Sequence, residues 1–160
     1  MPEEKKTVVI GVGNILMGDD GLGIYAVELL RQENLPPQVE VVDGGTAGID
    51  LIYLLEEAEY ALIIDCLDCG ETPGMMFRIP WGEISDGNRE EQIVSLHDMN
   101  LWSVLSLAEK LNKLPQVVIF GAQPETIALG QGLSPAVKDA VYPLVQAIIR
   151  EIYQIYGTPE

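Results

Sequence analysis

Three side chains in this 160-residue sequence combine a metal-binding type with a place at the edge of an expected element. Asp20 follows one apolar run, Asp65 ends another, and His97 precedes a helical pattern. If the runs form neighbouring parallel strands, the three side chains converge on one crevice at the carboxyl ends of those strands. Each residue alone could simply cap a helix. Together, two carboxylates and an imidazole suit a divalent first-row metal and leave positions open for water or substrate.

Strand and helix patterns alternate along the chain, as the positioning of these side chains requires. The expected strands are residues 7–13, 39–43, 60–65, 75–79 and 116–121. One expected helix follows residue 20, two span residues 49–58 and 98–112, and a fourth begins at residue 135 with Ser134 as its cap. No helix separates the third and fourth strands, so we expect the fourth to be an antiparallel edge strand. The pattern predicts one domain over residues 1–160, a three-layer α/β fold with a mostly parallel sheet.

The charge balance excludes several classes of partner. The chain has 25 acidic and 9 basic side chains, a formal net charge of -16. Nucleic-acid binding needs a basic patch, and an anionic membrane surface would repel this chain. The first residues lack the basic start and apolar stretch of a signal peptide, and no run approaches the roughly 18 apolar residues of a membrane span. We therefore expect a cytoplasmic monomer with no nucleic-acid or membrane partner.

The glycine-rich segment at residues 11–23 suggests a dinucleotide site, because Asp43 ends the second strand and could bind a ribose. Leu16 replaces the third glycine of that pattern. Asp19 and Asp20 would also repel a pyrophosphate from the helix N-terminus. The glycines can simply allow the chain to turn, and we expect Asp19 to cap the following helix.

Cys66 and Cys69 form a CxxC at the start of an expected loop over residues 66–74. The pair suggests a redox site or half of a zinc site, for which Asp65 and His97 could supply the other ligands. Alternatively, these are two small side chains that happen to lie close in the sequence. The chain has no GxSxG or HExxH motif, and no serine lies in a context that would activate it.

Several segments resemble the signature motifs of the hydrogenase maturation proteases, the endopeptidases that process the large subunit of [NiFe] hydrogenases. The resemblance spans nearly the whole chain, with the motifs in the family's order and spacing. The matching segments are 11–23 (GVGNILMGDDGLG), 43–48 (DGGTAG), Asp65 with Gly70 and Pro73-Gly74, 95–98 (SLHD) and 121–125 (GAQPE). Cys66 stands where the family commonly has a small residue, and Cys69 is not part of the family pattern.

The resemblance implies a doubly wound α/β/α sandwich of the phosphorylase/hydrolase-like type, with a five-stranded sheet and one antiparallel strand. It implies an endopeptidase that removes the C-terminal extension of the [NiFe] hydrogenase large-subunit precursor after nickel insertion. By motif, the catalytic and metal-contacting positions fall on Asp20, Asp65 and His97, and Asp43 supports the loops. Nickel would be carried by the precursor, and other divalent metals could occupy the same site.

Two other functions remain open on the residues. One is a thiol-redox or zinc-binding protein that uses Cys66 and Cys69. The other is a nickel checkpoint that binds the precursor without cutting it. The sequence does not decide whether the metal is catalytic or only recognised, and it does not identify the general base.

Overall fold

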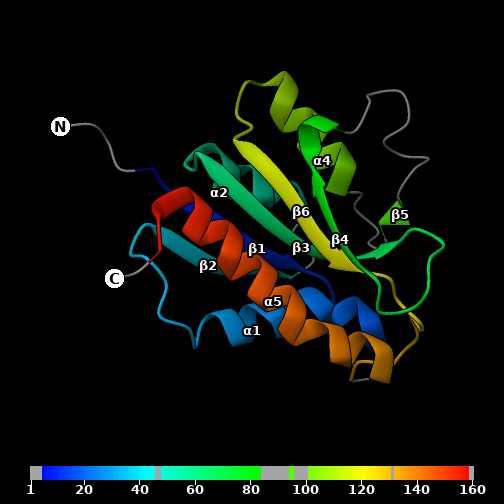
Figure 1. Ribbon diagram of the computed structural model, residues 1–160. Coiled ribbons are helices and arrows are strands. Elements are labelled where there is room, and N and C mark those ends of the chain that lie inside the picture. Colours follow the sequence, from blue (N-terminus) through cyan, green and yellow to red (C-terminus); the bar gives the residue numbers. More distant parts are fainter. Residues whose placement is uncertain (1–4, 46–47, 84–93, 96–100, 131, 159–160) are drawn as a thin grey trace.

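Helices cover both faces of a central sheet in the computed structural model (Figure 1). The structure describes residues 5–45, 48–83, 94–95, 101–130 and 132–158. The strands are β1 Thr7–Val12, β2 Val39–Gly45, β3 Tyr60–Asp68, β4 Met76–Pro80, β5 Val94–Ser95 and β6 Gln116–Ala122. The helices are α1 Leu22–Leu30, α2 Leu51–Glu56, α4 Leu101–Lys110 and α5 Pro135–Tyr156, with short 3-10 turns η1 Gly18–Gly21, η2 Gly48–Asp50 and η3 Trp81–Glu83. Within these ranges, no helix is long and apolar enough to cross a membrane.

The strand order across the sheet is β2-β1-β3-β6-β4. β1, β2, β3 and β6 are parallel to one another, and β4 runs antiparallel beside β6. The three strands that had to be neighbours for a shared site, β1, β3 and β6, lie side by side. The three-layer α/β fold with one antiparallel edge strand is therefore confirmed. The two-residue β5, which pairs antiparallel with the end of β3, was not predicted from the sequence.

Alternation along the strands divides the core into two layers. Successive strand side chains point to opposite faces. In β3, Leu62 and Ile64 pack with α1 and α5, whereas Ala61 and Ile63 pack with α2 and α4. Figure 1 shows the same division, with α1 and α5 on one face of the sheet and α2 and α4 on the other. Because both faces are covered, the central strands are largely apolar, and polar side chains gather toward their carboxyl ends.

β3 is longer than the sequence indicated. Residues 66–68 were expected to begin a loop, but they continue the strand, so this prediction was wrong. Cys66 pairs with Ala122 of β6, and Leu67 pairs with Ser95 of β5. Both side chains are fully buried, and the neighbouring strands on each side account for the extension. Asp65 consequently lies within the strand, with a fixed backbone on either side.

Two glycines let α1 approach the sheet closely. A β-carbon on Gly23 would lie 2.5 Å from the carbonyl oxygens of Ile64 and Val12, and one on Gly11 would lie 2.2 Å from the Gly23 carbonyl oxygen. No side chain fits at either position without moving the backbone. The glycines are thus required for helix–strand packing, and this packing fixes the turn that carries Asp20 against the ends of β1 and β3.

We expect Gly23→Ala to destabilise the protein by about 3 kcal/mol or more, because overpacking a backbone contact costs at least as much as overpacking side chains. The free energy of unfolding can be measured by urea titration followed by circular dichroism. Gly82→Ala is the matched control, since a β-carbon there meets nothing within 4 Å. The control should change stability by no more than about 0.5 kcal/mol. Equal stability of the two variants would contradict the close-approach argument.

Candidate active site

Two of the three predicted site residues are buried carboxylates at the ends of neighbouring strands. Asp20 lies in η1, directly after the β1 loop, and is 3% exposed; Asp65 lies in β3 and is fully buried. The backbone amide of Asn14 donates to Asp20 Oδ2 over 3.1 Å, and that of Cys66 donates to Asp65 Oδ1 over 2.7 Å. Both carboxylates are thus held by nearby backbone.

Cys66 directly follows Asp65 in β3 and is fully buried. Burial raises the pKa of Cys66, and the charges of Asp65, Asp19 and Asp20 raise it further. Charges influence a buried group in this way only over short distances, where water does not screen them. The η1 turn, which carries Asp19 and Asp20, lies against β3, the strand that carries Asp65 and Cys66.

The same environment argues against a redox or zinc role for the cysteines. Cys66 is fully buried, and its Sγ donates to the Ala122 carbonyl oxygen over 3.7 Å. Cys69 is half-buried, and its pKa is raised by burial and by the charges of Asp68 and Glu71. Redox and metal-binding cysteines need a lowered pKa, because the thiolate is the reactive form. Both cysteines are free thiols, Cys66 buried and Cys69 half-buried, and the raised pKa of each disfavours the reactive thiolate.

Asp19 is the residue that the sequence interpretation assigned wrongly. We expected it to cap the following helix, but neither η1 nor α1 has a side-chain cap. Its fully buried carboxylate instead accepts four hydrogen bonds, from the backbone amides of Glu125, Thr126 and Ser134 and from the Ser134 hydroxyl, over 2.7–3.0 Å. These donors are 106 to 115 residues away in the sequence, so no local pattern could reveal them.

Ser134 also has a role other than the one predicted for it. It occupies the position before α5 that we predicted for a cap, but its hydroxyl donates to Asp19 and accepts no hydrogen bond from an α5 amide. Backbone hydrogen bonds join the same two segments: Gly18 donates to the Gly130 carbonyl over 2.9 Å, and Gly130 donates to the Leu16 carbonyl over 2.8 Å. The η1 turn and residues 125–134 therefore form one connected unit.

The pKa of Asp19 is consistent with this role. Burial alone would raise the pKa, but the hydrogen bonds from Thr126, Ser134 and Glu125 outweigh it and hold the pKa below its ordinary value of 3.8. The carboxylate is therefore charged at neutral pH. It stabilises the loop by accepting charge-assisted hydrogen bonds, which are stronger than neutral ones.

Gln123 is a second residue that sequence reasoning did not single out. It is 6% exposed, and its Oε1 accepts from the backbone amides of Cys69 over 2.8 Å and Glu71 over 3.2 Å. Its Nε2 donates to Asp68 Oδ1 over 3.0 Å, and this bond is the main reason that the pKa of Asp68 is lowered. Its place directly after the expected strand, within the matching segment 121–125, is the signal that could have found it. Gln123 attaches the segment after β3 to the end of β6.

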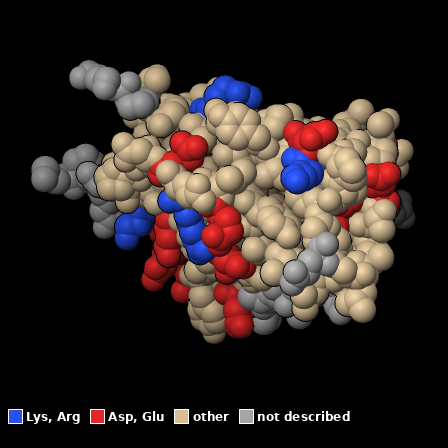
Figure 2. Space-filling view, turned by 90° about the horizontal axis from the view of Figure 1, so that it is seen from below, with Lys and Arg blue, Asp and Glu red and all other residues tan. Residues whose placement is uncertain are grey.

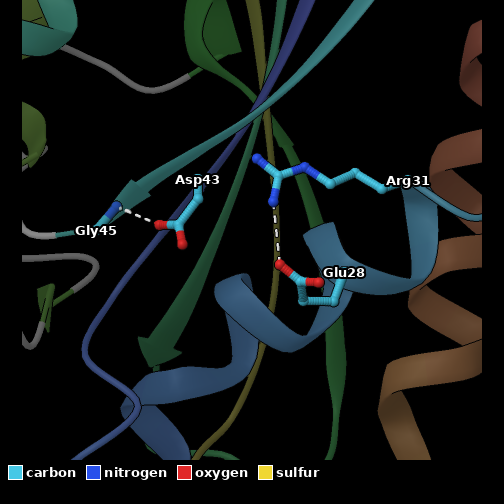
Figure 3. A network of polar contacts seen from close by, with 4 residues as sticks. All are labelled: Glu28, Arg31, Asp43 and Gly45. Carbon is cyan, nitrogen blue, oxygen red and sulfur yellow. Dashed lines mark hydrogen bonds and ion pairs between the residues drawn. The ribbon is translucent and has the colours of Figure 1, made fainter.

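Asp43 lies on the second strand, and Figure 3 shows its carboxylate turned toward the backbone of Gly45. The Gly45 amide donates to Asp43 Oδ1 over 2.9 Å, and the Gly45 carbonyl in turn accepts from the Gly13 amide over 2.8 Å. The nearby Arg31 pairs with Glu28 of α1 (Figure 3). Asp43 thus orders its own turn and, through Gly45, the loop after β1, which agrees with the loop-supporting role expected for it.

His97, the third predicted site residue, lies outside the described residues. The nearest described residues on either side are Ser95, whose backbone pairs with Leu67 at the end of β3, and Leu101, the first residue of α4. Among the described residues, no three His, Cys, Asp or Glu side chains form a group that could hold a metal. Asp20 and Asp65 can therefore supply carboxylate ligands, a general base, or both, and a complete metal site would need a further ligand.

Comparison with known proteins identifies relatives along most of the chain. A family model described as hydrogenase maturation protease matches residues 24–151. The chain is 38% identical over 141 residues to the hydrogenase expression/formation protein HoxM of Cupriavidus necator, covering 84% of this chain and 69% of that protein. It is 30% identical over 154 residues to the hydrogenase 2 maturation protease of Escherichia coli, covering 90% and 88% of the two chains. The solved structure of the E. coli hydrogenase maturating endopeptidase HybD superposes with a TM-score of 0.83 at 30% identity, covering 93% of each chain.

The four hydrogen bonds that Asp19 accepts, which we call the Asp19 anchor, predict a graded loss of stability. Asp19→Asn replaces one acceptor oxygen by an NH₂ group that faces backbone N–H donors, so we expect a loss of about 2–3 kcal/mol; Ser134→Ala removes a single donor and should cost about 1 kcal/mol. Denaturant unfolding measures both. Asp139→Asn, at an exposed position of α5, is the matched control and should be near neutral. In Asp19→Asn, hydrogen exchange should lose protection first at the amides of residues 125, 126 and 134.

The anchor also predicts a pH dependence. Because folding lowers the pKa of Asp19, its contribution to stability is complete above the unfolded value near 3.8 and is lost as pH falls through the lower folded value. The stability difference between wild type and Asp19→Asn should therefore be constant from pH 7 to about pH 5 and shrink below pH 4. A difference that shrank already near pH 6 would show that Asp19 is not held in this way.

Proposed function

Since this chain belongs to the hydrogenase maturation protease family and is an endopeptidase, we propose that it removes the C-terminal extension of a [NiFe] hydrogenase large-subunit precursor after nickel insertion. The observation that supports this most directly is the pair of buried carboxylates, Asp20 and Asp65, at the ends of neighbouring strands. The sequence motifs had singled out the same two residues. We propose His97 as their third partner, on the same motif argument.

We propose that nickel is part of the substrate and is recognised by coordination. The ion arrives on the precursor, held largely by the precursor's own cysteines, and Asp20, Asp65 and His97 fill its open positions. Carboxylate oxygens and imidazole nitrogen are suitable ligands for a divalent first-row metal. Asp20 and Asp65 are both buried, and a nearby cation stabilises the charged form of a buried carboxylate. Cleavage would then depend strictly on nickel insertion, because a precursor without the ion would lack the contact.

The cleavage step needs a water molecule directed at the scissile carbonyl carbon. Asp20 or Asp65 can accept the proton of that water as a general base. The substrate's nickel ion can instead polarise the carbonyl or lower the pKa of a bound water. In either case the buried position of the carboxylates keeps bulk water away from the reacting groups and strengthens the electrostatic interactions there.

Substitution of the three residues tests the assignment. We expect Asp20→Asn, Asp65→Asn and His97→Ala each to slow processing of the nickel-loaded precursor by at least about 100-fold, because loss of general-base catalysis alone has that effect. Mass spectrometry of the precursor, incubated with and without each variant, measures the loss of the C-terminal extension. Asp50→Asn is the matched control, since Asp50 is exposed in η2 and should leave processing unchanged.

Three results would separate the possible functions. Normal cleavage by all three folded variants would contradict the site assignment. Binding of the precursor without any change in its length would favour a checkpoint that does not cut. Equal cleavage of nickel-free and nickel-loaded precursor would contradict recognition through the ion.

A further inference from the structure

An apolar cavity of about 530 Å³ lies between α1 and the first turns of α5. Its walls are chiefly the side chains of Tyr25, Leu29, Leu133, Val141 and Tyr142. Tyr142 is 64% exposed, and Tyr25, Leu29 and Leu133 are half-buried. Aromatic rings that are partly exposed beside aliphatic side chains are typical of protein-binding surfaces, since such rings bury a large area at low entropic cost.

The cavity is continuous with the loop that carries Asp20. A β-carbon on Gly21 would lie 3.2 Å from Tyr25 Cε2 and 3.4 Å from Ile15 Cγ2, so both side chains lie against the residue that follows Asp20. Beyond Ile15, Leu16 is 50% exposed, and its carbonyl accepts from the amide of Gly130. This bond places Leu16 beside the segment of Leu129, which is 85% exposed. We call the cavity together with Ile15, Leu16 and Leu129 the α1/α5 surface.

The α1/α5 surface carries few charges although the chain as a whole has a net charge of -16. α1 contains one charged residue, Glu28, and residues 122–137 contain only Glu125. The cavity has one charge of each sign in its lining, Glu28 and Lys138. Figure 2, which views the molecule from below, the side on which α1 lies in Figure 1, shows uncharged atoms between separate clusters of red and blue. Uncharged, apolar area of this extent on an acidic protein indicates a docking surface.

We propose that the α1/α5 surface binds the folded body of the precursor whose C-terminal extension enters the Asp20 and Asp65 site. This inference rests on the proposed function and adds to it the surface that selects the substrate. A partner seated over the cavity, Leu16 and Leu129 lies beside the η1 turn, so its tail has a short path to the carboxylates. A second copy of this chain fits less well, because two molecules of charge -16 repel each other around any shared apolar contact.

Charge substitutions at the exposed side chains test the proposal without disturbing the core. We expect Tyr142→Glu and Leu129→Glu each to raise both KM and Kd for the nickel-loaded precursor by about tenfold or more. Loss of a central apolar contact in an interface has effects of that size. The rate at saturating precursor should stay unchanged, since neither residue reaches the carboxylates. Tyr53→Glu is the matched control: Tyr53 is 70% exposed, but it lies on α2, across the sheet, and should alter neither constant.

Biolayer interferometry measures binding independently of cleavage, so failure of the docking proposal can be told from failure of the proposed function. Wild type that binds but does not cut, with binding weakened by Tyr142→Glu, supports the docking surface and overturns the proteolytic function. Normal cutting with unchanged KM and Kd in both variants overturns the docking surface alone. A dimer of wild type that Tyr142→Glu dissociates identifies a second copy as the occupant and likewise overturns it. Wild type that neither binds nor cuts overturns both proposals.

Discussion

The buried carboxylate of Asp19 is the interaction on which the geometry of the site depends. Its four hydrogen bonds fasten the η1 turn to residues 125–134, two segments that approach each other only in the folded protein. Asp20 is the next residue, so its position is set by the same bonds. Leu129 and Leu133 belong to the fastened segment, so the proposed docking surface is set by them as well. One charged group therefore fixes both the residue proposed for chemistry and the residues proposed to receive the substrate.

The acidic residues near the strand ends have different partners, and this difference separates their roles. Asp19 uses both oxygens on backbone amides and a hydroxyl of its own protein, which leaves it fully engaged. Asp68 is engaged by Gln123 and by the amide of Gly70. Asp20 and Asp65 are held by local amides within the turn and strand to which they belong. The first two residues use their charge to build loops, whereas we assign the chemistry to Asp20 and Asp65 on their burial and on the sequence motifs.

Much of the fold could be predicted from the sequence because its signals are local. The apolar run at residues 60–65 predicts a buried strand, and the glycine-rich loop before α1 predicts a turn after the neighbouring strand β1. Both are present. The role of Asp19 could not be predicted, because a carboxylate before a helix looks the same whether it caps that helix or binds a segment more than 100 residues away. The environment of Cys66 could not be predicted from local patterns either. Its raised pKa comes from burial and from acids on other segments, which the CxxC spacing does not contain.

The way Asp19 is bound also determines which changes the site can tolerate. Three of its four donors are backbone N–H groups, and those do not depend on the side chains at positions 125, 126 and 134. Exposed side chains in this loop, such as Leu129, make no part of the anchor. Substitutions there can therefore change the surface presented to a partner while the backbone, and with it Asp20, stays in place. The proposed substrate selection and the proposed catalysis share one support but use separate side chains, so we expect that selection can be altered without loss of the carboxylate geometry.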